Sequence, residues 1–211
     1  MATSGELTTI VATALGVPFE TVREHLRNIR RKPGTITFSG YGRSAAGMTP
    51  RDAVRLLLAV AGSQFVKDSR ATLDGFAKLQ PVRQSRRSQP DPTDPPLFDL
   101  EQHLVWMIQR VIDRRADLPA DYVRTSKEVR APLALTLIFA ASASQELPRV
   151  AIARNLLGGG RGAISFATPG WTAPVLSPAE YAATVRDSGL IQERHVTTWS
   201  FAEIALALGR V

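Results

Sequence analysis

The chain has 211 residues, of which 44% are hydrophobic and 21% charged, enough for one large domain or two small ones. It contains no cysteine, which excludes disulfides, thiolate metal ligands and a cysteine nucleophile. The longest apolar run, residues 131–143, is too short to span a bilayer, and the first six residues lack the pattern of a signal peptide. We therefore expect a cytoplasmic protein with no membrane partner.

The net charge of +7 is distributed unevenly along the chain. Residues 1–90 contain 14 Lys/Arg and 6 Asp/Glu, whereas residues 91–211 contain 12 and 13. A basic segment beside a neutral one is typical of proteins that bind a polyanion, although a basic surface that serves only solubility gives the same counts. Of the basic residues 22 are Arg, which pairs bidentately with phosphate and guanine, but a GC-rich genome produces the same bias.

Two helices joined by a glycine turn are predicted for the N-terminal segment. Thr3 and Glu6 have the spacing of a capping box, from which a helix runs to about residue 14. Gly16 supplies the backbone freedom of the turn, and Pro18 opens a second helix that runs to about Arg31. The second helix has an apolar stripe of residues three or four apart, which we expect to face inward: Phe19, Val22, Leu26 and Ile29.

The opposite face of this second helix is charged. Two helices crossing at a wide angle around such a turn form a helix–turn–helix, whose second helix enters a DNA major groove about 12 Å wide. Residues 15–27, Leu-Gly-Val-Pro-Phe-Glu-Thr-Val-Arg-Glu-His-Leu-Arg, resemble the Leu-Gly-Val-x-x-x-Thr-Val-x-x-His-Leu pattern of winged helix–turn–helix transcription regulators. Residues 34–37 lie where these proteins begin the wing, and residues 40–43 lie at its tip.

The resemblance covers about residues 4–62, and residues 42–53 also resemble proteins of bacterial prophages, notably alphaproteobacterial ones. It implies that residues 18–31 are the recognition helix. The implied base contacts are Glu20, Arg23, Glu24 and Arg27. The implied phosphate contacts are Arg30, Arg31 and Lys32. Two residues of the wing tip, Tyr41 and Arg43, are implied to reach a minor groove or the backbone.

Glu20 and Glu24 depart from what a DNA-facing surface normally carries. Glutamate accepts a hydrogen bond from cytosine N4, but it is repelled by phosphate. The two acidic residues therefore indicate either sequence reading or a recognition helix rotated from this register.

Further elements are predicted along the rest of the chain. Thr49 and Asp52 form a second capping box, opening an apolar helix to about residue 61 that we expect to be buried or paired with another chain. A helix follows at residues 66–79, and residues 80–96, with five prolines and three arginines, read as a linker. Beyond it we predict helices at 97–115, 177–187 and 200–208 and strands at 133–140, 149–154, 163–167 and 191–197.

The predicted fold class is therefore α+β. Residues 1–79 form a winged helix–turn–helix DNA-binding domain, residues 80–96 a Pro/Arg linker, and residues 97–211 a small oligomerisation or effector domain with a short antiparallel sheet. The glycine-rich residues 157–162 lack the Gly-Lys-Ser/Thr ending of a Walker loop and read as a hairpin turn. His25, His103 and His195 lack metal-ligand spacing, and we expect His25 and His103 to be packing or surface residues.

We find no catalytic constellation and expect no enzyme, cofactor or metal. The function predicted is a sequence-specific, double-stranded-DNA-binding transcriptional regulator, related to phage or prophage proteins and acting as a homodimer. Two alternatives remain open: a small terminase subunit that packages DNA as a ring, and a protein-interaction adaptor that binds no nucleic acid.

Overall fold

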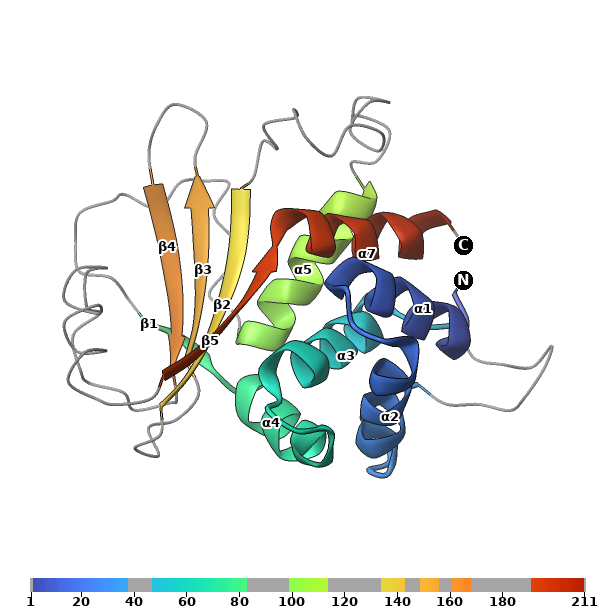
Figure 1. Cartoon of the computed structure of the whole chain (residues 1–211). Helices are drawn as coiled ribbons and strands as arrows, with labels where there is room; N and C mark the ends of the chain where they lie inside the picture. Colours follow the sequence, from blue (N-terminus) through green and yellow to red (C-terminus); the bar gives the residue numbers. More distant parts are fainter. Residues whose placement is uncertain are drawn as a thin grey trace.

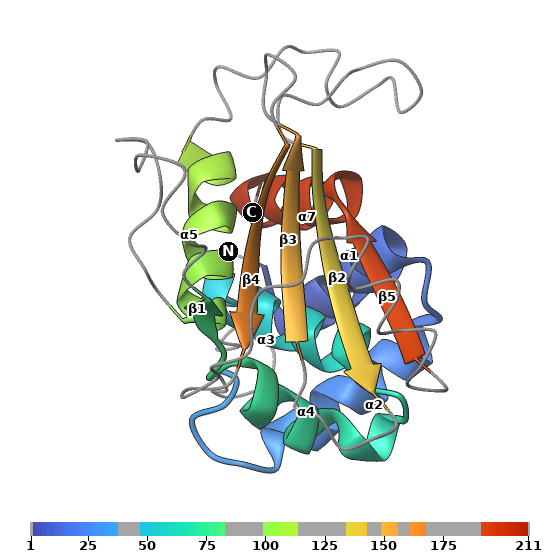
Figure 2. The same cartoon turned by 90° about the vertical axis from the view of Figure 1, so that its left-hand side faces the viewer.

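A computed structural model describes residues 2–37, 47–82, 99–113, 134–142, 149–155, 161–167 and 191–210. In this part of the chain, helices cover one face of an antiparallel sheet (Figures 1 and 2). The prediction of a mixed α+β fold is thus confirmed. Within the described ranges, no helix has the length and apolar character needed to cross a membrane. The predicted helix at 177–187 lies outside the described residues.

The helices have the following bounds. Those before the proline-rich segment are α1 (Ser4–Leu15), α2 (Phe19–Arg30), α3 (Pro50–Gly62), the 3-10 helix η2 (Val66–Asp68) and α4 (Ser69–Phe76). Those after it are α5 (Leu100–Asp113) and α7 (Thr198–Arg210). The single helix predicted over 66–79 is found as a 3-10 turn, η2, followed directly by α4, which ends at Phe76, and the Ser69 hydroxyl donates to the Val66 carbonyl where the two meet.

Local signals determine how the first helices begin and end. In α1, Thr3 N–H donates to the Glu6 carboxylate at 2.6 Å and Glu6 N–H to the Thr3 hydroxyl at 3.3 Å, which confirms the capping box. The Thr3 backbone bond also holds the pKa of Glu6 below its ordinary value. Gly16 ends α1 with φ +63°, a left-handed conformation that glycine adopts without strain.

The sheet has strand order β1-β4-β3-β2-β5, and every neighbouring pair is antiparallel. Its strands are β1 (Gln80–Val82), β2 (Ala134–Ser142), β3 (Arg149–Asn155), β4 (Arg161–Ala167) and β5 (Ile191–Thr197). β3 and β4 pair with Ile152 opposite Ile164, as the predicted hairpin requires. β1 occupies the first three residues of the predicted linker and pairs with β4, so the sheet joins segments from both ends of the proline-rich stretch.

One hydrophobic core unites the described elements. α3 lies at its centre, with nine of its residues buried, which agrees with the prediction of a buried helix. α1 packs against α7 and α3 against α5, so helices from both sides of residues 80–96 share this core. The described residues before and after residues 80–96 pack against one another around this core (Figure 1). The division of the chain into two domains remains a prediction.

Candidate nucleic-acid interface

α2 lies at the edge of the helical layer (Figure 1), and most of its apolar stripe is buried against the core. Val22, Leu26 and Ile29 are at most 4% exposed and pack into the common core. Phe19 was predicted to join them but is 41% exposed, so this prediction is wrong. At 3.6 residues per turn Phe19 lies roughly 50° from the centre of the stripe, in the first turn of the helix.

The outward face of α2 carries two exposed arginines, each paired with a glutamate three residues earlier. Arg23 Nη2 lies 2.5 Å from Glu20 Oε2, and the two side chains are 53% and 65% exposed. Arg27 Nη1 lies 2.9 Å from Glu24 Oε1, with exposures of 66% and 39%. Such exposed pairs are worth about 0.3–0.5 kcal/mol, so a phosphate or a base can displace them at little cost.

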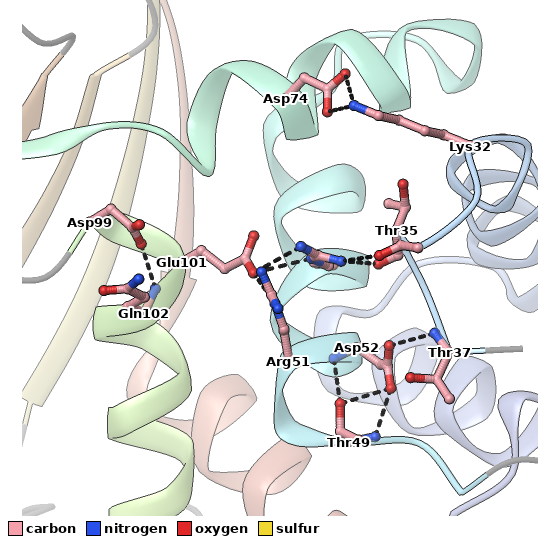
Figure 3. A network of polar contacts seen from close by, with 12 residues as sticks. Lys32, Thr35, Thr37, Thr49, Arg51, Asp52, Asp74, Asp99, Glu101 and Gln102 are labelled. Carbon is pink, nitrogen blue, oxygen red and sulfur yellow. Dashed lines mark hydrogen bonds and ion pairs between the residues drawn. The ribbon is translucent and has the colours of Figure 1, made fainter.

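The predicted phosphate contacts at the end of α2 differ in exposure and in partners. Arg31 is exposed, and Arg30 is half-buried. Lys32 turns toward α4, where Nζ lies 3.0 and 3.2 Å from the two carboxylate oxygens of Asp74 (Figure 3). Arg70 Nε lies 4.0 Å from the same carboxylate, so Asp74 joins the end of α2 to α4.

The base of the predicted wing is closed by one carboxylate. Asp52 accepts hydrogen bonds of 2.8 Å each from Thr37 N–H, Thr49 N–H and the Thr49 hydroxyl (Figure 3). Residues 37 and 49 are thereby held together. Thr35–Thr37, which lie where the resemblance places the start of the wing, do not form a strand. The predicted wing-tip contacts Tyr41 and Arg43 lie outside the described residues.

A buried ionic network supports this base from the other side. The Glu101 carboxylate of α5, 9% exposed, accepts from Arg55 at 3.1 Å and from the Arg51 side chain (Figure 3). Arg55 also donates to the carbonyls of Gly34 at 2.9 Å and Thr35 at 2.5 Å. The chain leaving α2 is therefore fixed to α3 and, through Glu101, to α5.

His25 attaches α2 to α4 beneath the outward face. Its ring is 4% exposed, and Nδ1 lies 2.7 Å from the Ser69 hydroxyl. Burial lowers the pKa of His25 from its ordinary value near 6.5, and the positive charge of Arg194 lowers it further. His103 is also buried, so both residues pack in the core as predicted; the side chain of His195 lies outside the described part. Among the described residues, no three His, Asp or Glu side chains are grouped to hold a metal ion.

The sequence interpretation missed the basic residues that lie beside α2 in space. Asn28 Nδ2 donates to the Val66 carbonyl at 2.8 Å, which holds η2 against α2. This contact places η2 and the start of α4, which carry Lys67 and Arg70, beside α2, although Lys67 follows the end of α2 by 37 residues. No local pattern signals it, because it depends on how two distant helices pack.

Comparison with known proteins adds no assignment: no protein-family model, curated protein or solved structure matches the chain. The site is therefore interpreted from its own geometry. That geometry offers guanidinium and ammonium groups, which bind phosphate and base acceptors, and two carboxylates, which accept hydrogen bonds from cytosine amino groups.

Proposed function

We propose that this protein is a sequence-specific, double-stranded-DNA-binding transcriptional regulator, with α1 and α2 as the helix–turn–helix of a winged domain. The observation that carries the proposal is the exposure of Arg23 and Arg27 on a face of α2 that the described residues leave uncovered. A sealed face would have excluded insertion of this helix into a groove.

The dimensions and charges of α2 support the same function. Its 12 residues span about 18 Å along the helix axis. The diameter of an α-helix including its side chains, about 10–12 Å, matches the width of a major groove, about 12 Å. Residues 18–32 contain five basic and two acidic side chains, so the helix and its end are positive overall. The pairing with Glu20 and Glu24 is weak enough for a duplex to replace the carboxylates as the partners of the arginines.

We propose further that the active form is a homodimer. One recognition helix reads only a few base pairs, whereas two helices separated by one DNA turn of about 34 Å multiply the specificity. Sedimentation of the purified protein tests this point: a dimer agrees with the regulator, and a ring of eight or more copies indicates the terminase alternative.

The experiment that tests DNA binding is selection from a random-sequence duplex pool, followed by titration of the selected duplex. We expect the wild-type protein to enrich a defined sequence and Arg23→Ala/Arg27→Ala to lose affinity for it. Each lost bidentate base contact costs about 1–3 kcal/mol. Arg110→Ala, on α5, removes a charge away from α2 and serves as the matched control.

A charge-neutral variant separates base reading from overall electrostatics. Replacing Glu20, Arg23, Glu24 and Arg27 all by Gln removes two positive and two negative charges and leaves the net charge at +7. We expect this variant to keep its affinity for unselected duplex and to lose preference for the selected sequence. Enrichment of no sequence by the wild-type protein, or an unchanged preference in the neutral variant, rejects the proposed role of α2.

A further inference from the structure

A second basic surface lies beside α2 and is fixed to it by two contacts. We call it the α4 shoulder and define it as Lys67, Arg70 and Lys32. Asn28 of α2 donates to the carbonyl of Val66, one residue before Lys67, and His25 contacts Ser69, one residue before Arg70. The shoulder therefore cannot move independently of the recognition helix proposed above.

The three cations of the shoulder are accessible and incompletely neutralised. Lys32 and Arg70 are 44% and 53% exposed and share the single carboxylate of Asp74, at 3.0 and 4.0 Å. Lys67 is exposed, and its Nζ lies over the ring of Phe65 at 5.5 Å, a cation–π contact that orients the ammonium without cancelling its charge. Asp68, half-buried, is the neighbouring acid in η2. The surface therefore keeps a positive excess beside α2.

We propose that the α4 shoulder binds the phosphate backbone of the same duplex that α2 enters. This inference rests on the proposed function. A helix seated in a major groove has a sugar–phosphate backbone on each side, and the element that flanks the helix meets that backbone. Lys67, Arg70 and Lys32 then supply affinity without sequence preference. Asp74 holds Lys32 and Arg70 in the free protein and competes with phosphate for them.

The first test is the double variant Lys67→Gln/Arg70→Gln, titrated with the selected duplex and with a scrambled duplex at several salt concentrations. Each phosphate contact contributes about 0.9 to the slope of log affinity against log salt, so we expect the slope to fall by about 1.8. Between 50 and 200 mM salt this corresponds to about a tenfold smaller loss of affinity. The affinity should fall equally for both duplexes, because phosphate carries no sequence information.

The second test is expected to increase the affinity for duplex rather than decrease it, and it leaves all three cations in place. Asp74→Asn removes the competing carboxylate, and we expect tighter binding of both duplexes. A purely structural role of the Lys32–Asp74 pair predicts weaker or unchanged binding instead. Arg110→Gln on α5, which α3 separates from α2 in Figures 1 and 2, is the matched control for the loss of one positive charge.

The outcomes separate this inference from the function on which it rests. A double variant with the slope and affinity of Arg110→Gln, while Arg23→Ala/Arg27→Ala still loses the selected duplex, overturns the shoulder and leaves α2 as the DNA-reading element. Weaker or unchanged binding by Asp74→Asn also overturns the shoulder. Failure of the wild-type protein to bind any duplex overturns both proposals together.

Discussion

Arginine–glutamate pairs occur in two different settings in this protein. On α2, Arg23 and Arg27 are more than half exposed, and their partners belong to the same helix. Between α3 and α5, Arg55 is 15% exposed, and its partner Glu101, 9% exposed, comes from a helix 46 residues later. The buried pair connects elements and resists replacement, whereas the exposed pairs connect nothing and are available to a ligand. The same chemistry thus serves the fold in one place and a proposed interface in the other.

The largest effect that sharpens this comparison is expected at Glu101. Glu101→Gln leaves Arg55 partly buried beside a neutral amide, and breaking a buried ion pair from one side costs about 3 kcal/mol of unfolding free energy. Urea denaturation measures this loss. Arg51→Gln is the control, because Arg51 binds the same carboxylate but is 63% exposed and should cost about 1 kcal/mol or less. Equal losses in the two variants would contradict the distinction by burial.

A second arginine, the half-buried Arg194, joins the sheet to the helices. Its Nη1 donates to the carbonyls of Val60, at 3.4 Å, and Ala61, at 3.3 Å, and also to that of Ser63, at the end of α3. Arg194→Met keeps an unbranched apolar stem but removes the guanidinium and these bonds, and we expect a loss of about 2 kcal/mol of unfolding free energy. The denaturation midpoint reports it; an unchanged midpoint would show that β5 does not stabilise α3 in this way.

A smaller effect is expected from pH, through His25. Its pKa in the folded state is lowered by burial and then by Arg194, so the unfolded chain takes up the proton first as the pH falls. The stability is therefore complete above about pH 6.5, the unfolded value, and decreases below it. His25→Gln should show a weaker decline between pH 7 and 5 in denaturation measurements. Parallel curves for the two proteins would contradict this origin of the pH dependence.

The smallest effect on stability is expected on the outward face of α2. Glu24→Gln/Arg27→Gln removes one exposed pair and should change the unfolding free energy by less than about 0.5 kcal/mol. Thermal unfolding checks this expectation. A loss of unfolding free energy as large as that of Glu101→Gln would show that the exposed pair stabilises the fold. It would contradict the proposal that this pair is available to a ligand.

The parts of the structure that could be predicted from the sequence are those governed by neighbours along the chain. The capping boxes at Thr3 and Thr49, the turn at Gly16 and the strand Ile191–Thr197 follow from local side chains, backbone freedom and periodicity. Phe19 shows what periodicity cannot predict. The apolar stripe indicates which face of the helix is buried, but it does not indicate how far along the helix the burial extends.

The contacts that define the candidate site depend on tertiary packing instead. Asp74 reaches Lys32 across 42 residues, and Glu101 reaches Arg51 across 50. No spacing rule connects residues so distant, so the α4 shoulder could not be predicted even though its charges are visible in the sequence. The outward arginines of α2 could be predicted, because the inward stripe of the same helix determines the opposite face.

The most direct test of the central claim measures whether a duplex covers the outward face of α2. Because the chain has no cysteine, Glu24→Cys introduces a single reactive thiol there, and Gln102→Cys introduces one on the exposed surface of α5. Saturating selected duplex should slow maleimide modification at position 24 and leave position 102 unchanged. Modification of position 24 at the same rate with and without bound duplex would contradict the account.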